Sequence, residues 1–474
     1  MPSTPAAIRK SVCFFAASRS RFPCASKNVT AGGYTPLRSF MMLLSCVLPV
    51  ILEGILRIYY MPGGQARKGD FCFPRGTHMV QWSRKRIEKP RRCTVAAEAI
   101  RTYLEEKHGE MMTLLERLVR IDNRSSNKTG VDQMGSILQA EYEVLGFSTE
   151  RFEQTHCGSS MILRRDAPGR RVLLICHLDS VFPADMLDHP PLFRKEGNLA
   201  YGPGVVDMKA CLVGCLCAVK ALLDTGSPVP ALSVLLAGDE ELGSLSITDE
   251  IIKEGKRSDF CLVTEGARPG MALVTERKGL AKVNIRCEGK DAHAGNEPQK
   301  GINALLALCD VLPRIAALND WDQDRFCLVT QMNAGEAPNV VPRLGTAYVD
   351  LRFSSLETYE YLKAQIDSIL NAPRQDGAKL TWKTELIKPP MAPVPGFEEL
   401  LNAVIQSGDE LGIPYRWVKA GGITDGNTVA SVGTPTLDGM GPVGGMMCSE
   451  SEFLEIDTMV PCAARLALAV SKLK

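Results

Sequence analysis

The sequence lacks the features that mark several classes of protein. Its 16 cysteines among 474 residues are too sparse for a small secreted scaffold held together by disulfides. Apolar residues make up 45% of the chain and charged residues 23%, which excludes a disordered or collagen-like protein. No internal repeat is visible. What remains is an ordinary globular composition, with enough length for two or three domains and for a core that can bury a site.

A basic surface is also missing from most of the chain. The net charge of +1 hides an uneven distribution, because residues 1–95 carry 16 Lys and Arg against 3 Asp and Glu. The remaining residues, 96–474, carry 39 against 51. An acidic body argues against a nucleic-acid partner. Several cysteines lie in apolar runs of this body, where they indicate small buried side chains in a reducing compartment, so we expect a cytoplasmic protein.

The basic segment 1–95 allows several interpretations. Residues 1–39 contain no acid, and the apolar run 40–52 has only 13 residues, which is short of the ~20 that span a bilayer. Membrane association is therefore not expected. The run fits a signal-peptide core better, so organelle targeting or secretion through residues 1–60 stays open. We favour a third interpretation, an over-long start with true translation from near Met79.

From Thr94 onward the pattern becomes regular. Thr94 predicts a helix start, and the following apolar spacing predicts a helix with a break near Gly109. Short apolar runs then alternate with helical patterns, which favours an α/β domain with a mostly parallel sheet. The expected strands are 171–176, 231–237 and 260–264, and the expected helices are 130–145, 211–223 and 247–254.

The pattern changes near residue 275. Alternating strands at 279–287 and 346–353 and helices at 301–318 and 356–370 predict an inserted α+β, ferredoxin-like unit. We therefore divide the chain into the basic extension 1–95, an α/β domain in two parts, 96–275 and 387–474, and an insert at 276–386.

Acidic side chains and one histidine follow the predicted strands. They are His177 and Asp179 after RVLLIC, Asp207 in YGPGVVDMK, Asp239, Glu240 and Glu241 after ALSVLLA, and Glu265 after FCLVT. Ligands of open α/β sheets bind beyond the carboxyl ends of the strands. One histidine with several carboxylates suits a divalent cation such as zinc. Adjacent Glu240 and Glu241 point in different directions, so one can bind metal while the other acts as a general base.

Seven strings in order carry a family resemblance: CHLDSVFP, YGPGVVDMKA, AGDEELGS, TEGARP, DAHAGNEPQKGINAL, NVVPRLGTAYVDLRF and GGITDGNT. From about residue 100 to the end, the chain resembles the di-zinc peptidases and deacylases. This family includes glutamate carboxypeptidase, acetylornithine deacetylase, succinyl-diaminopimelate desuccinylase and aminoacylase, and the glutamate carboxypeptidase branch is the most similar.

The resemblance implies a role for each matching residue. Two zinc ions are expected, with His177 and Glu265 on the first, Glu241 on the second and Asp207 bridging them. Glu240 would be the catalytic base and Asp179 would orient His177. The two-part α/β domain, 96–275 and 387–474, would be the catalytic domain. The insert would be a lid and dimerisation domain, which implies a homodimer. In it, His293 would reach the partner subunit's active site and steady the oxyanion, Arg352 would hold the substrate's carboxylate, and Asn339 would add a polar contact.

The chain departs from the family pattern at one metal position. The family places a histidine in a Gly-rich loop where this chain has GPVGGMMCSESEFLE, with Cys448 at that place, and no histidine follows His293. A cysteine thiolate is a good zinc ligand, so Cys448 can complete the second site. The alternative is that the second metal is lost or labile.

The predicted function follows from these residues and from the resemblance. We expect a zinc-dependent exopeptidase of the carboxypeptidase type, which cleaves an amide bond next to a free carboxylate with a metal-activated water. Its substrate would be a small peptide or an N-acyl amino acid. The alternatives are an N-acyl-amino-acid deacylase and a non-catalytic binding protein with an impaired second metal site.

Overall fold

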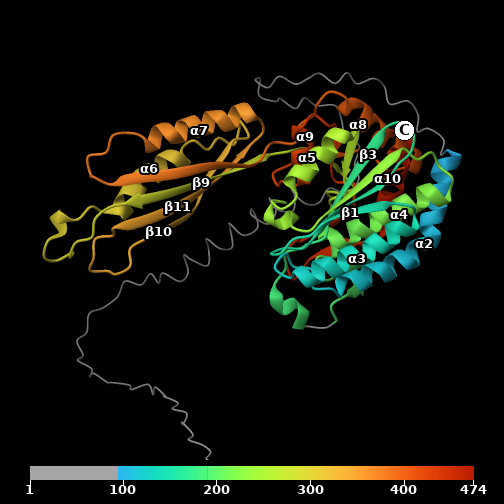
Figure 1. Ribbon diagram of the computed structural model, residues 1–474, viewed down its shortest axis with the longest axis horizontal. Helices are drawn as coiled ribbons and strands as arrows, with labels where there is room; N and C mark the ends of the chain where they lie inside the picture. The colour runs from blue at the N-terminus through green and yellow to red at the C-terminus, as the bar shows by residue number, and fades with distance from the viewer. Residues whose placement is uncertain (1–93, 189–190) are drawn as a thin grey trace, which may run out of the picture. The chain divides into compact units, whose positions relative to one another are not determined.

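The computed structural model describes residues 94–188 and 191–474, so the expectations for the basic extension lie outside the described residues. A six-stranded sheet forms the centre of the catalytic part (Figure 1). Its strands, in order across the sheet, are β1 (Ser148–Phe152), β2 (Ser160–Arg165), β6 (Ala231–Ala237), β3 (Arg171–His177), β7 (Phe260–Val263) and β14 (Thr436–Leu437). The four strands from β6 to β14 are parallel, which confirms the expected α/β class. The edge strand β1 and its neighbour β2, which pairs antiparallel with both β1 and β6, were not expected.

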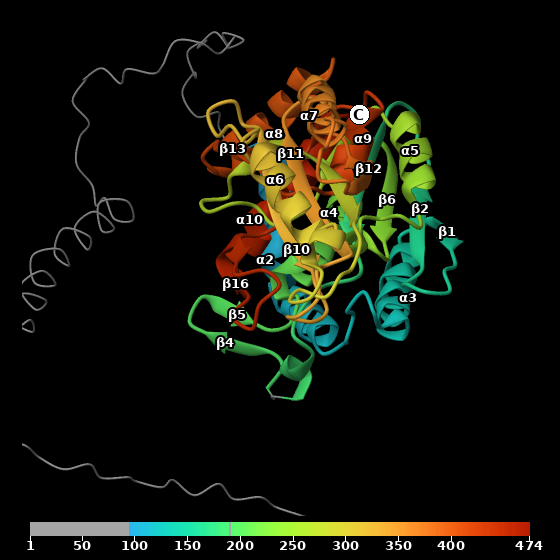
Figure 2. The same ribbon diagram turned by 90° about the vertical axis from the view of Figure 1, so that its left-hand side faces the viewer.

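Helices cover both faces of this sheet (Figures 1 and 2). They are α2 (Val95–Val119), α3 (Lys128–Val144), α4 (Ala210–Asp224), α5 (Thr248–Arg257), α8 (Phe397–Leu411), α9 (Asp425–Ser431) and α10 (Met459–Lys472). Helix α4 packs between β3 and the pair α2 and α10, whereas α5 and α9 pack on each other and contact β3 and β7. The catalytic part is therefore a layered α/β structure.

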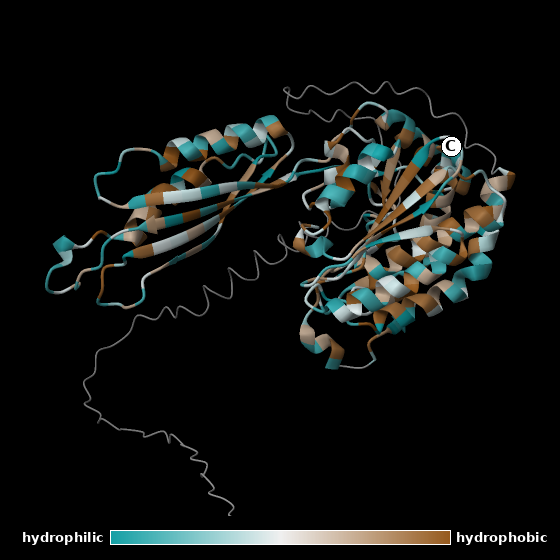
Figure 3. Ribbon diagram, in the orientation of Figure 1, coloured by the Kyte–Doolittle hydropathy of each residue, from teal (hydrophilic) through white to brown (hydrophobic). Residues whose placement is uncertain are grey.

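Alternation along β3 divides its buried side chains between two cores. Leu174 belongs to the larger core under α2, α4 and α10, and Leu173 and Ile175 belong to the smaller core under α5 and α9. A strand covered on both faces is expected to be apolar throughout. The central strands accordingly appear strongly hydrophobic in Figure 3.

The insert has its own sheet and core. Its elements are β9 (Gly279–Glu288), α6 (Ala304–Ala316), β10 (Phe326–Ala334), β11 (Leu344–Phe353), α7 (Leu356–Leu370) and β12 (Lys379–Lys388). The strands form an antiparallel sheet in the order β10-β11-β9-β12, and apolar side chains of both helices and the sheet build a separate cluster. This is the strand–helix–strand–strand–helix–strand order that the pattern predicts.

Shorter elements complete the described chain. They are β4 (Arg194–Glu196), β5 (Leu199–Tyr201), β8 (Leu273–Arg277), β13 (Trp417–Ala420), β15 (Gly444–Gly445) and β16 (Phe453–Glu455), with the helical turns η1 (Ala184–Asp188), η2 (Val205–Lys209), η3 (Glu240–Leu242), η4 (Pro298–Lys300) and η5 (Ile456–Thr458). None of the described helices is both long and apolar enough to cross a membrane.

The predicted break in the first helix is wrong. Helix α2 begins after Thr94, whose Oγ1 accepts a hydrogen bond from the Ala97 amide at 3.2 Å, and runs through Gly109 without interruption. A glycine inside a helix costs only ~1 kcal/mol relative to alanine. The buried side chains of Leu104 and Met111, on either side of Gly109, outweigh that cost by packing in the main core.

We predict that Leu174→Ala lowers the free energy of unfolding by about 2–5 kcal/mol, because it removes a fully buried side chain from the central strand. Urea denaturation of the full chain measures the loss. Leu245→Ala is the control, since that side chain is 73% exposed, and its effect should stay within about 0.5 kcal/mol. Equal effects of the two substitutions would contradict the assigned core.

Candidate metal centre

Three predicted ligands meet beyond the ends of the parallel strands. His177 is the last residue of β3, Glu265 lies two residues after β7, and Asp207 lies in the turn η2. His177 Nε2 is 3.1 Å from Asp207 Oδ1 and 3.4 Å from Glu265 Oε1. Ligand atoms of a tetrahedral zinc bound at ~2.0–2.2 Å lie ~3.4 Å apart, so this donor set fits one ion.

The second imidazole nitrogen of His177 is held by the backbone. Its Nδ1 lies 2.9 Å from the carbonyl oxygen of Asp179 and 3.5 Å from the Asp179 carboxylate. Because a carbonyl oxygen can only accept, this contact puts a proton on Nδ1 and leaves Nε2 to bind a metal. Asp179 therefore contacts the ring of His177 mainly through its backbone carbonyl, and its carboxylate is the more distant acceptor.

The Asp179 carboxylate has a different set of partners. It is fully buried and accepts hydrogen bonds from the backbone amides of Glu240 at 3.0 Å and Glu241 at 3.3 Å, and from Ser125 Oγ at 2.7 Å. It therefore ties the end of β3 to the turn that carries both glutamates. Ser125 was not predicted, because it lies 54 residues from Asp179 and in none of the seven strings.

A second group of metal-ligating side chains shares Asp207 with the first. Ligand atoms of Asp207, Glu241 and Cys448 all lie within 4.8 Å of one another, and Asp207 Oδ2 is 4.0 Å from Cys448 Sγ. Asp207 thus turns Oδ1 toward His177 and Oδ2 toward Cys448, which is the arrangement of a bridging carboxylate. Glu241 Oε1 is buried and has no hydrogen-bond partner among the described residues, as expected of an oxygen that binds a cation.

The concentration of acids shifts the pKa values in the metal-free site. Burial and neighbouring carboxylates raise the pKa of Glu241 to about 8, against an opposing effect of His177. Burial likewise raises the pKa of Glu240 well above its usual range. Burial would lower the pKa of His177, but its contacts with Asp179, Asp207 and Glu265 outweigh it and raise that pKa well above the usual value. Burial raises the pKa of Cys448 to about 12.

Glu452 fixes the loop that carries Asp207. Its Oε1 accepts hydrogen bonds from the backbone amides of Val206 and Asp207, both at 2.9 Å, and Ser180 Oγ donates to the Asp207 carbonyl at 2.8 Å. Glu452 is not among the residues that the sequence pattern predicts for the site. Its position four residues after Cys448, in the same string, is the signal that could have pointed to it.

The string GGITDGNT contacts the segment that follows the turn η3, which carries Glu240 and Glu241. Its Asp425 accepts a hydrogen bond from Ser244 Oγ at 2.7 Å and from Lys388 Nζ at 2.8 Å, and both ion-pair partners are almost fully buried. Ser244 lies directly after the turn η3 with Glu240 and Glu241. This string therefore supports the turn and is not itself part of either metal-ligating group.

His293 and Asn339 lie together in exposed loops of the insert. His293 Nδ1 accepts hydrogen bonds from the amides of Gly295 at 3.0 Å and Asn296 at 3.1 Å, while the Asn339 carbonyl accepts one from the Ala294 amide at 2.9 Å. The neutral ring therefore carries its proton on Nε2, which can donate outward. Among the described residues, no hydrogen bond links either side chain to the metal-ligating groups.

Arg352 lies where the insert meets the string GGITDGNT. Its Nε donates to Asp350 Oδ1 at 2.8 Å, its Nη2 donates to Asp350 Oδ2 at 3.3 Å, and its Nη1 donates to the Gly421 carbonyl at 3.3 Å. A guanidinium has five N–H groups. Two therefore remain without a partner among the described residues, one on each terminal nitrogen, enough for a bidentate carboxylate.

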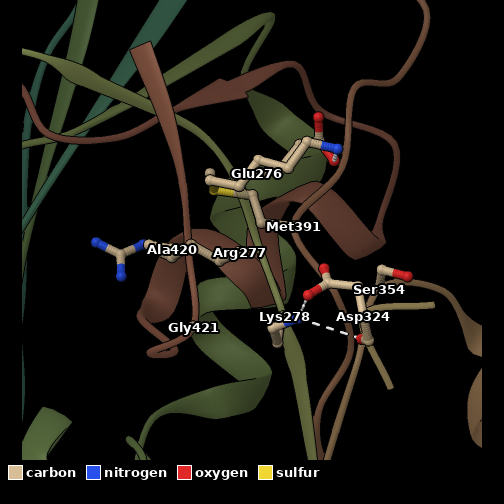
Figure 4. A pocket seen from close by; sticks show the side chains of 9 residues that line it. Glu276, Arg277, Lys278, Asp324, Ser354, Met391, Ala420 and Gly421 are labelled. Atoms are coloured by element: carbon tan, nitrogen blue, oxygen red, sulfur yellow. Dashed lines mark hydrogen bonds and ion pairs between the residues drawn. The ribbon is translucent and has the colours of Figure 1, made fainter. Parts of the chain in front are cut away.

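A small pocket of about 90 Å³ lies at the same junction, lined by residues from β8, β13 and the insert (Figure 4). Its two lysines are already neutralised. Lys278 forms an ion pair with Asp324, toward which it points in Figure 4, and Lys419 forms one with Glu276 at 2.8 Å. Arg277, the third cation of the lining, pairs with Asp438. Every cation among the described lining residues thus has a carboxylate partner. Arg352 is also paired, with Asp350, but it keeps two N–H groups without a partner among the described residues and is therefore the better candidate for an anionic group.

Comparison with known proteins places the chain in a family. Residues 173–472 match peptidase family M20/M25/M40. Carboxypeptidase G2 from Pseudomonas sp. (strain RS-16) is 28% identical over 376 residues, which cover 77% of this chain and 90% of that protein. Succinyl-diaminopimelate desuccinylase from Paracidovorax citrulli (strain AAC00-1) is 30% identical over 336 residues, covering 65% and 84%.

Solved structures show the same fold. A tripeptidase from Staphylococcus aureus matches with a TM-score of 0.68 at 19% identity, over 77% of this chain and 98% of that one. An M20 family metallo-carboxypeptidase from Sulfolobus solfataricus matches with a TM-score of 0.61 at 18% identity, over 77% and 99%. The YXEP protein of Bacillus subtilis, described as a dinuclear metal-binding peptidase, matches with a TM-score of 0.57 at 12% identity, over 77% and 98%. Together with the sequence match over residues 173–472, these findings show that the chain belongs to peptidase family M20/M25/M40.

Proposed function

We propose that this family member is a zinc-dependent exopeptidase of the carboxypeptidase type, which cleaves the amide bond next to a free carboxylate. The observation that carries the proposal is the pair of metal-ligating groups that share Asp207, with Glu240 in the adjoining turn. Carboxypeptidase G2 and the succinyl-diaminopimelate desuccinylases, by their names, act on molecules of this kind.

The metal-ligating side chains divide into two sets in this proposal. His177, Asp207 and Glu265 hold the first ion, and Asp207 and Glu241 hold the second. Divalent ions bound there would polarise the scissile carbonyl and make a water molecule more acidic. The donor chemistry of one imidazole and several carboxylates suits zinc.

Glu240 carries the proton from the attacking water to the leaving nitrogen. It comes from the same turn as Glu241, but its side chain is in neither metal-ligating group. It takes a proton from the attacking water while the water oxygen bonds to the carbonyl carbon. When the C–N bond breaks, Glu240 passes that proton to the leaving nitrogen, which leaves as an amine. A carboxylate whose pKa is raised by burial is suited to both steps.

The insert supplies recognition. Arg352 grips the substrate's carboxylate with its two free N–H groups, and Asn339 adds a polar contact. His293 donates a hydrogen bond from its Nε2–H group to the developing oxyanion. We propose that it acts in the site of a second copy of the chain, because within the described residues it has no contact with the metal-ligating groups.

A homodimer through the insert agrees with its surface. Strand β10 is an edge strand, and its outer side pairs with no described strand. Leu328 and Met332 on β10 are 39% and 42% exposed, and Leu306 on α6 is 64% exposed. An open strand edge with exposed apolar side chains is suited to contact with a second copy.

N-acyl-amino-acid deacylation is the second candidate, favoured by the desuccinylase relatives at up to 30% identity. It breaks the same bond type with the same groups, but the carboxylate can lie on either product. A non-catalytic role fits less well, because the proposed base and the shared acid are both in place. Hydrolysis rates on peptides with a C-terminal glutamate and on N-succinyl amino acids distinguish the two activities.

We predict that Glu240→Gln lowers kcat by about 10²–10⁴-fold and leaves the bound metal unchanged, because the amide cannot take up the proton. Steady-state kinetics and metal analysis of the full chain measure the two effects. Glu196→Gln, at a side chain that is 60% exposed, is the control and should change neither. Activity of the Glu240 variant within tenfold of the parent would contradict the assignment of the base.

We predict that Arg352→Lys raises KM by about 10–100-fold for substrates with a free carboxylate, since lysine cannot form the bidentate contact. The kcat/KM for the matching carboxyl-amide substrate should change little. Arg343→Lys, on the same insert with a side chain 61% exposed, is the control. An equal loss for both substrates would mean that Arg352 acts on structure and not on the carboxylate.

We predict that metal binding releases protons and strengthens as the pH rises through and beyond pH 8. Glu241, His177 and, if it is a ligand, Cys448 have raised pKa values in the metal-free site, so each holds a proton at pH 7 that an ion must displace. Affinity should grow about tenfold per pH unit for each proton released. Calorimetric titration with zinc in two buffers of different ionisation enthalpy counts the protons. The Glu241→Gln variant should release fewer protons when it binds zinc. An unchanged number of released protons would refute the role of Glu241.

A further inference from the structure

We infer that Cys448 binds the second ion through its thiolate sulfur, which gives that site a preference for thiophilic metals that the first site lacks. The inference rests on the proposed metal dependence and deepens it. The first group offers one imidazole and carboxylate oxygens, whereas the second offers sulfur and carboxylate oxygens. The two sites of one chain would then differ in the metals they select.

The distances agree with a shared ion. Cys448 Sγ lies 4.0 Å from Asp207 Oδ2, and the ligand atoms of both residues and of Glu241 lie within 4.8 Å of one another. A tetrahedral zinc bound ~2.3 Å from sulfur and ~2.1 Å from oxygen holds these two atoms ~3.6 Å apart. The Asp207–Cys448 pair therefore needs a shift of about 0.4 Å, and the contacts to Glu241, at up to 4.8 Å, need at most about 1.2 Å. Cys448 is also exposed, so an ion from solvent can reach the sulfur.

A second, independent observation comes from Glu241. Its Oε1 is buried, and no hydrogen-bond donor among the described residues contacts it. Buried carboxylate oxygens in folded proteins are nearly always paired. The missing partner is supplied if an ion lies between Glu241, Asp207 and Cys448.

The loop that carries Cys448 is fixed in place. It connects the paired strands β15 and β16, and Glu452, just before β16, binds the backbone amides of Val206 and Asp207. Cys448 itself has a φ of 61°, in the left-handed region that non-glycine residues rarely adopt. The same hydrogen bonds therefore hold both Asp207 and the backbone near Cys448.

The charge of the bound ions compensates the acidic surroundings of Cys448. Without metal, burial and the nearby carboxylates of Glu241 and Asp207 raise the pKa of Cys448, so an ion must displace the thiol proton. Asp207, Glu241, Glu265 and a Cys448 thiolate would then bring four negative charges to two divalent ions. Thiolate ligands favour zinc, cadmium and cobalt over manganese and magnesium, which prefer oxygen. Oxygen and imidazole ligands at the first site discriminate less strongly between these metals.

Cobalt substitution of the full chain tests the inference, because a thiolate bound to Co²⁺ produces an intense near-ultraviolet charge-transfer band. The parent should bind two Co²⁺ ions and show this band. Cys448→Ser should lose the band and weaken the second ion by about 100-fold or more. Cys448→His should bind two ions without the band. Cys309→Ser removes another exposed thiol, on the insert, and should behave as the parent.

Competition between metals tests the selectivity. In the parent, Mn²⁺ should replace the second Co²⁺ at least about tenfold less readily than it does in Cys448→His. A parent that binds two ions without the band, or a Cys448→Ser variant with an unchanged band, would overturn the inference. A parent with one ion that gains a second only in Cys448→His would also overturn it, because the second site would then be lost in this chain.

The result is separable from the proposed function. A band that depends on Cys448 in a chain that hydrolyses no amide would leave the metal inference standing and refute the peptidase. A parent that hydrolyses substrate and loses this activity in Glu240→Gln, but shows no charge-transfer band, would support the proposed peptidase and refute the metal inference.

Discussion

The position of one carboxylate sets the geometry of the whole centre. Asp207 is shared by both metal-ligating groups, so a displacement of its loop would disturb both at once. The protein holds that loop from two sides, through Glu452 and through Ser180. Because these contacts are made to backbone atoms, the Asp207 side chain is left free to act as a ligand.

The concentration of negative charge is the cost of this arrangement. Burial of several acids near one another raises the pKa values of Glu240 and Glu241 and opposes folding of the metal-free site at neutral pH. The surrounding frame compensates with ion pairs that need no metal. Lys388 pairs with Asp425, and Arg277 pairs with Asp438 at 2.6 Å, both in almost fully buried positions. The site can therefore be strongly acidic while its frame stays ordered.

In the proposed function, chemistry and recognition come from different parts of the chain. The metal-ligating residues and Glu240 belong to the layered α/β part, whose strand ends fix their spacing. Arg352 and His293 belong to the insert, which has its own core. In the proposal, the departure at Cys448 changes the metal-ligating part and leaves the insert untouched.

Much of the fold follows from local pattern. Alternation of apolar runs with helical spacing predicts the strands β3, β6 and β7 and the helix α4, because those segments are buried and periodic. The half-exposed edge strand β1 carries no such signal. The break assigned to Gly109 failed because a propensity of ~1 kcal/mol is smaller than the packing of its neighbours.

The local pattern suffices to show which ligand residues follow the strands, since parallel strands end at one edge and so bring His177, Glu241 and Glu265 together. Which oxygen faces which neighbour depends on how the chain packs. Ser125, Glu452 and Asp425 support the centre from positions 54 to 246 residues distant from their partners, and Asp179 orients His177 by its carbonyl. Such contacts depend on how distant segments pack, and local spacing along a chain carries no information about that packing.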